Sequence, residues 1–176
     1  DQPLDRNVDM YDPSAPLEEA WTLPSAWYGD PRIAELERRT AFSRTWQCVG
    51  RADQVREPGQ YLTAQVAGEP ILVVRGGDGT LRGFFNVCRH HAAAVMTEPA
   101  GTARSLRCPY HGWTYNLDGR LRAAPAMAKN TCFDKADYKL PKVRCEEWLG
   151  WIMVTLNPDA PPVAGRLSQV QDLIAD

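Results

Sequence analysis

Two short segments of the chain each combine a cysteine with a histidine. The first has the pattern C-x-H from Cys88 to His90, and the second has C-x-x-H from Cys108 to His111. A [2Fe–2S] cluster with mixed ligands takes two thiolates on one iron and two imidazoles on the other, so each segment must supply one ligand of each kind. The sequence therefore predicts a [2Fe–2S] cluster bound by Cys88, His90, Cys108 and His111.

This ligand set is suited to electron transfer. Thiolates stabilise ferric iron, whereas neutral imidazoles leave the second iron less electron-rich and easier to reduce. A histidine ligand also keeps one ring nitrogen that can lie at the surface and pass an electron to a partner. Pro109 fixes its own φ, and Gly112 allows the backbone to turn closely after His111.

Structural zinc is the competing interpretation, because two cysteines and two histidines also suit a tetrahedral Zn²⁺ site. Common zinc modules pair two cysteines in one arm with two histidines in the other. Here both arms are mixed and one has the spacing C-x-H, so a zinc-binding module is a remote alternative. His91 has no partner cysteine in either arm, and we interpret it as a loop residue beside the site, not a ligand.

The residues around both segments resemble the Rieske non-haem iron oxygenase α subunits, in their N-terminal Rieske domain. Among the branches of that family, the likeness is greatest to the choline and carnitine monooxygenase group. The family usually has histidine at the position of Phe85 and arginine at that of His91. The matching stretches are W-Q-C-V-G at residues 46–50, P-G-Q-Y at 58–61, F-F-N-V-C-R-H-H at 84–91, L-R-C-P-Y-H-G-W-T-Y at 106–115, L-D-G at 117–119 and W-L-G-W-I at 148–152.

The resemblance implies an oxidoreductase of the mono- or dioxygenase type. Its Rieske cluster would relay electrons from an NAD(P)H-dependent reductase or a ferredoxin to a mononuclear non-haem iron. That iron would use O₂ to hydroxylate a small organic substrate, either a quaternary amine or an aromatic compound. Cys88 and Cys108 would bind the iron that stays ferric, and His90 and His111 the redox-active iron. His111 would face an aspartate of a neighbouring α subunit, which implies a homotrimer or a multiple of it.

The resemblance also assigns roles around the ligands. Tyr115 is expected either to donate a hydrogen bond to a ligand sulfur, as the corresponding tyrosine does in the family, or to be a core residue only, and Arg89 to lie beside the ligands. From its residue type alone, Trp113 is expected to be a core residue or to cover the cluster, because aromatic side chains exclude water. High-potential Rieske proteins have a serine donor at the position of Trp113. Fewer donors to the cluster favour its oxidised state, so a low midpoint potential of roughly −150 mV is expected.

The histidine count limits what this chain does by itself. A mononuclear iron in this family takes two histidines and a carboxylate. The chain has three histidines, of which two belong to the predicted cluster. We therefore predict no catalytic residue here, with His111 as the electron exit and the mononuclear Fe(II) in a catalytic domain that is absent. A free-standing Rieske ferredoxin is the alternative function with the same ligands.

Composition fits one ordinary soluble domain. The chain has 176 residues, of which 44% are hydrophobic, and a net charge of −2. It shows neither a basic stripe nor a long apolar span, so we expect neither nucleic acid nor membrane as a partner. Without an apolar signal core before Leu17, a cytoplasmic protein is expected. Cys48, Cys132 and Cys145 lack the spacing of a disulfide framework and are expected to be buried or free thiols.

The residue patterns predict a mainly β fold, an antiparallel Rieske-type β-sandwich with a subdomain of two cluster-binding loops. Strands are expected at residues 47–51, 61–66, 71–75, 81–87, 143–148 and 151–156. Function would lie on the loops at strand ends, where a rigid sheet positions them. The glycines of residues 76–79 match no phosphate-binding motif, and they predict a hairpin turn.

The same patterns divide the chain into three parts. Residues 1–29 are expected to form an N-terminal arm with a short helical turn near 17–21. Residues 30–157 would form the Rieske domain, led by a helix at 30–46 with Asp30 as N-cap and Pro31 at N1. Residues 158–176 would contain a proline-rich linker and the start of the absent catalytic domain.

Overall fold

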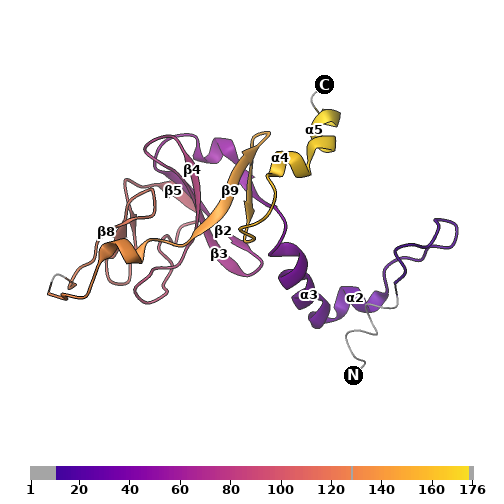
Figure 1. Ribbon diagram of the computed structural model, residues 1–176, viewed down its shortest axis with the longest axis horizontal. Helices are drawn as coiled ribbons and strands as arrows, with labels where there is room; N and C mark the ends of the chain where they lie inside the picture. Colours follow the sequence, from indigo (N-terminus) through magenta and orange to yellow (C-terminus); the bar gives the residue numbers. More distant parts are fainter. Residues whose placement is uncertain (1–10, 128, 175–176) are drawn as a thin grey trace.

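The computed structural model describes residues 11–127 and 129–174, so part of the predicted N-terminal arm lies outside the described residues. A curled antiparallel sheet of seven strands, in the order β1-β10-β9-β4-β3-β2-β5, forms the centre of the molecule (Figure 1). Its strands are β1 Gln47–Arg51, β2 Gln60–Val66, β3 Glu69–Arg75, β4 Leu81–Phe85, β5 Ala100–Thr102, β9 Lys142–Trp148 and β10 Trp151–Thr155. The predicted mainly antiparallel β fold is confirmed.

A second, small sheet has the order β6-β7-β8. Its strands are β6 Leu106–Arg107, β7 Thr114–Tyr115 and β8 Leu121–Ala123. The sequence analysis predicted none of these three strands, nor β5, because runs of two or three residues are too short to show a period of two. In Figure 1 this small sheet lies at the end of the molecule opposite the helices near both chain ends.

Strand β3 explains how the two sheets pack together. Its side chains alternate, with Ile71 and Val73 in one core and Leu72 and Val74 in the other, and all four are fully buried. The first core fills the curl of the large sheet. The second joins the large sheet to the small one and contains both predicted cysteine ligands. A strand that is apolar on both faces thus supports the site directly.

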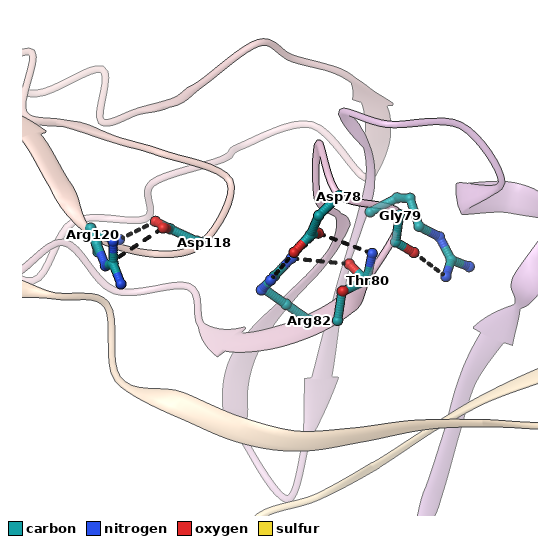
Figure 2. Close-up of polar contacts among 7 residues, drawn as sticks. Asp78, Gly79, Thr80, Arg82, Asp118 and Arg120 are labelled. Atoms are coloured by element: carbon teal, nitrogen blue, oxygen red, sulfur yellow. Dashed lines mark hydrogen bonds and ion pairs between the residues drawn. The ribbon is translucent and has the colours of Figure 1, made fainter.

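The hairpin between β3 and β4 has the turn predicted from its glycines. Asp78 accepts hydrogen bonds from the Arg82 guanidinium at 2.6 and 2.7 Å and from the Thr80 amide at 3.1 Å (Figure 2). Figure 2 shows a similar pair, Asp118 with Arg120, in the turn between β7 and β8. Both turns are therefore fixed by an aspartate that accepts from residues just after it, which is typical of Asx turns.

Gly119 places the β7–β8 turn against the large sheet. Its φ is +84°, and a Cβ at this position would lie 2.4 Å from the ring of Phe84. The Gly119 carbonyl also accepts a hydrogen bond from the Leu140 amide at 2.9 Å. Because a larger side chain would push the turn away from β4, this glycine maintains the contact between the two sheets.

The helix predicted at residues 30–46 is present but shorter. It consists of α3 Pro31–Glu37 and a π-helical turn, η1 Arg38–Phe42, and the Asp30 side chain accepts from the Arg32 amide at 2.9 Å. Three hydroxyl side chains near its end, those of Thr40, Ser43 and Thr45, donate to carbonyls four residues earlier, a pattern that weakens helices. The short helix α2 Ser25–Gly29 was not predicted from the sequence. Near residues 17–21, where a helical turn was expected, the chain forms a turn in which the Glu19 amide donates to the Pro16 carbonyl.

The segment after β10 is packed against the domain, although its prolines predicted a linker. The Trp46 indole donates to the Pro161 carbonyl at 2.8 Å, and the Glu146 carboxylate accepts from the Val163 amide at 2.9 Å. Ala160 and Val163 are almost fully buried. Two short helices follow this segment, α4 Val163–Arg166 and α5 Ser168–Ile174. Elsewhere in the described chain there are two short 3₁₀ helices, η2 Ala52–Val55 and η3 Lys135–Tyr138. Across the described residues, none of the helices is long and apolar enough to cross a membrane.

Candidate metal centre

Two loops with the same backbone hydrogen bonds contain the four predicted ligands. Loop 1, residues 88–93, follows β4, and loop 2, residues 108–113, joins β6 to β7. In each, the cysteine amide donates to the carbonyl five residues later, at 2.8 Å from Cys88 and 2.9 Å from Cys108. The amide four residues after each cysteine donates back to the cysteine carbonyl, at 3.0 and 3.1 Å. Each loop thus presents a cysteine and a histidine on an equivalent turn.

Both turns require a residue in the left-handed region. Gly112 takes this position in loop 2 with φ +72°, which agrees with the role expected for it. Ala92 takes the equivalent position in loop 1 with φ +58°. A non-glycine residue in this conformation costs about 1–2 kcal/mol. Loop 1 is therefore strained where loop 2 is relaxed.

The two thiols lie together on the interior side of the loops. Cys88 is 3% and Cys108 2% exposed. The pKa of the Cys108 thiol is raised, mainly by burial and also by its contact with the Cys88 thiol. Hydrogen bonds from the Tyr110 and His111 amides act in the opposite direction and lower this pKa. Two thiols in a dry site with amides directed at sulfur fit thiolates that bind a cation, since metal binding offsets the cost of ionising them.

Tyr115 connects the two loops. Its hydroxyl oxygen lies 3.3 Å from the Cys88 sulfur and accepts a hydrogen bond from the Arg89 amide at 3.0 Å. Tyr115 is fully buried, and burial raises the pKa of its hydroxyl well above the usual range. The hydroxyl therefore keeps its proton and has it available for the sulfur. Arg89 contributes its backbone here, while the residue itself is exposed.

The imidazoles lie on the outer side of the loops. The ring centroids of His90 and His111 are 4.8 Å apart, and His111 is exposed whereas His90 is half-buried. His91 is close to both, at 3.9 Å from His90 and 5.2 Å from His111, and one candidate ligand atom from each of the three lies within 4.8 Å of the others. Burial, followed by the two neighbouring imidazoles, lowers the pKa of His90, which favours the neutral ring that binds metals.

The only buried side-chain nitrogen or oxygen atoms without a hydrogen-bond partner in the described chain are both at this site. They are Nδ1 of His90 and Nε1 of Trp113. The two rings stack with centroids 4.7 Å apart and planes inclined by 7°. Two buried thiols and two imidazoles on equivalent loops, one with an unpartnered ring nitrogen, make up the donor set that a Rieske cluster requires, so the residues present fit that group.

Asn86 is a positioning residue that the sequence analysis overlooked. Its side-chain oxygen accepts from the amides of Val95 at 3.1 Å and Met96 at 3.0 Å, and its amide nitrogen donates to the Met96 carbonyl at 2.7 Å. Asn86 is 4% exposed. Loop 2 is closed by pairing of β6 with β7, whereas this side chain closes loop 1. A polar residue between apolar neighbours, two positions before a ligand, was the available signal.

The two positions that differ from the usual family pattern, Phe85 and His91, lie in different parts of the structure. Phe85 is half-buried and packs against the core that contains Ile71 and Val73, not the core that contains the two cysteines. His91 lies at the exposed rim of the candidate centre. Of the other cysteines, Cys48 and Cys132 are exposed, and Cys145 is half-buried.

Comparison with known proteins agrees with this geometry. Residues 45–143, more than half of the chain, match the family model described as the Rieske [2Fe-2S] domain. The carnitine monooxygenase oxygenase subunit of Acinetobacter pittii is 32% identical over 164 residues, covering 89% of this chain and 44% of that protein. The glycine betaine monooxygenase oxygenase subunit of Chromohalobacter salexigens is 39% identical over 155 residues, covering 88% of this chain and 34% of that protein.

Solved structures give the same result. The quaternary ammonium Rieske monooxygenase CntA in complex with L-carnitine superposes with a TM-score of 0.81 at 32% identity, over 87% of this chain and 45% of that one. The chain thus spans less than half the length of these relatives. The fold, the motif set and the family match confirm the predicted Rieske [2Fe–2S] cofactor. The chain belongs to the Rieske [2Fe–2S] domain family, and its relatives are oxygenase subunits of Rieske oxygenases.

Proposed function

We propose that Cys88, Cys108, His90 and His111 bind the [2Fe–2S] cluster and that this domain relays electrons within a Rieske oxygenase. The observation that supports the proposal most is the set of donors on the two loops: two buried thiols in contact, two neighbouring imidazoles, and Nδ1 of His90 buried and unpartnered. When bound, the cluster supplies a site that accepts and releases one electron at a time.

The protein residues around the site have separate tasks. The core that contains Cys88 and Cys108 excludes water from the thiolate side. The Tyr115 hydroxyl lies 3.3 Å from the Cys88 sulfur and would donate to it once that sulfur is a thiolate ligand, and the Arg89 amide orients that hydroxyl. On the outer side, His111 is an exposed imidazole that can pass an electron between the site and a partner surface. This division assigns electron entry and exit to the imidazole edge.

The relatives support a proposal for the partners and the substrate of the whole protein. An NAD(P)H-dependent reductase or a ferredoxin would supply electrons, and a mononuclear iron, in a neighbouring subunit of a trimer, would receive them from His111. The A. pittii and C. salexigens relatives are named for carnitine and glycine betaine. Both compounds are quaternary amines, so this class is favoured over aromatic compounds as the substrate of the complete enzyme.

The ligand assignment is tested by comparing His111→Ala with His91→Ala. The two imidazoles are neighbours on the same exposed rim, but only His111 is assigned to iron. Protein purified without oxygen is analysed for iron and acid-labile sulfide and, after reduction, by electron paramagnetic resonance (EPR). We expect two irons and two sulfides per chain with a Rieske signal in the wild type and in His91→Ala, and loss of that signal in His111→Ala. A zinc-loaded, colourless wild type, or loss of the signal only in His91→Ala, would refute the assignment.

A further inference from the structure

Trp113 has a buried indole N–H with no acceptor among the described residues. The residue is 2% exposed, and its Nε1 has no hydrogen-bond partner. Its ring is enclosed by three others, His90 stacked on its face and Phe133 and Tyr138 in edge contacts at 5.6 and 5.5 Å between centroids. A buried donor without an acceptor is costly because it loses its hydrogen bond to water, so such a group in a folded protein requires an explanation.

Two other tryptophans in the chain provide a comparison. The Trp46 indole donates to the Pro161 carbonyl at 2.8 Å, and the Trp148 indole donates to the Gln171 side chain at 3.3 Å. The fold therefore supplies an acceptor to tryptophans at other positions. Trp113 lacks one at the place where Nδ1 of His90 also lacks a partner, and the two rings are stacked. A cluster bound at this site would give a partner to both nitrogen atoms.

We propose that the Trp113 indole N–H donates a hydrogen bond to a sulfur of the cluster, either a bridging sulfide or a ligand thiolate. The inference rests on the ligand set proposed above. Cluster sulfurs gain negative charge on reduction, so a donor directed at them stabilises the reduced state more than the oxidised state. Trp113 then acts as a positioning residue for the cluster and raises its midpoint potential. This revises the expectation that tryptophan at this position only removes a donor.

The competing explanation is a hydrogen bond to an aromatic face. The rings of Phe133 and Tyr138 are inclined by 66° and 79° to the indole, an orientation in which an N–H could point into a π system. That arrangement would leave the cluster sulfurs untouched. The two explanations therefore differ in what happens to the cluster when the N–H is removed while the aromatic ring is kept.

The first experiment measures the midpoint potential of Trp113→Phe by spectroelectrochemistry on the cluster-loaded protein. We expect the equilibrium constant for reduction to fall about tenfold, which is 59 mV for a one-electron couple. Trp148→Phe is the matched control, because it also removes an indole donor, but one bonded to Gln171. It should keep the wild-type potential. An unchanged or raised potential in Trp113→Phe would overturn the proposal.

The second experiment leaves Trp113 in place, so it decides the question even when Trp113→Phe fails to load the cluster. Wild-type protein labelled with ¹⁵N only in its indole nitrogens is reduced and studied by pulsed EPR. We expect coupling of one ¹⁵N nucleus to the cluster spin, and it should persist in labelled Trp148→Phe. A normal Rieske signal without ¹⁵N coupling would refute the hydrogen bond alone, whereas the absence of any [2Fe–2S] signal would refute the ligand assignment.

Discussion

Replacement of Asn86 by alanine tests how loop 1 is held in place. The substitution removes three hydrogen bonds, two from the amides of Val95 and Met96 and one to the Met96 carbonyl. Val95 is 1% exposed, so water has little access to the groups left behind. With about 1 kcal/mol for each bond, Asn86→Ala is expected to lower the free energy of unfolding by about 3 kcal/mol. Because Asn86 precedes Cys88 by two residues, the loss falls on the ligand loop.

The assay has two parts. Urea unfolding gives the change in free energy, and the decay of visible absorbance in non-denaturing buffer gives the rate of cluster loss. Thr155→Val is the matched control, because Thr155 is a fully buried polar residue on β10 whose hydroxyl accepts from the nearby Asn157 amide. The control should lose about 1 kcal/mol and keep the wild-type rate of cluster loss. An Asn86→Ala protein that unfolds at the wild-type urea concentration, or retains its cluster as long as the control, would refute the role of Asn86.

Three further substitutions or treatments give distinct outcomes. Ala92→Gly should stabilise the protein by about 0.5–1 kcal/mol, because glycine adopts the left-handed conformation of Ala92 without strain. The control Ala94→Gly should destabilise the protein, and equal shifts of the two melting temperatures would contradict the prediction. Tyr115→Phe removes the hydroxyl beside the ligand thiol and should lower the midpoint potential; an unchanged potential would exclude that hydrogen bond. Burial raises the pKa of Cys145 to about 12 from 9.0, so iodoacetamide at pH 8 should label exposed Cys48 and leave Cys145 unmodified. The pKa of Cys145 is higher in the folded protein than in the unfolded chain, so the contribution of this thiol to the free energy of unfolding is fully present below about pH 9. That contribution is lost as the pH rises from 9 towards 12.

Local patterns identified the larger strands and missed the smaller ones for a physical reason. The six predicted strands correspond to β1, β2, β3, β4, β9 and β10, where apolar runs bounded by turn residues are long enough to read. Strand β5 forms because Ala100 pairs with Leu62, and β6 because Leu106 pairs with Tyr115. Such pairings depend on which segments meet in three dimensions, and three residues or fewer contain too little pattern to reveal it.

The candidate site divides in the same way. The ligand motifs are local, so spacing alone pointed to four residues and to the turn at Gly112. The support of those ligands is not local. Tyr115 reaches back to the Arg89 amide, and Asn86 bonds to residues beyond the far end of loop 1. The contact of His91 with His90 and His111 also depends on how the two loops approach each other.

The arrangement of the two loops separates two properties that are often changed together. The thiol side is enclosed by Tyr115 and the core, so substitutions there act on the charge and hydrogen bonding of the cluster and hence on its potential. The imidazole side is bordered by His91 and by Tyr110, which is 64% exposed and whose ring lies 3.9 Å from that of His111. Under the proposed function, substitutions of His91 or Tyr110 on that rim would act on the encounter with a partner. Because Tyr115 on the thiol side and His91 and Tyr110 on the rim do not overlap, the proposed function predicts that the midpoint potential and the encounter with a partner respond to different substitutions.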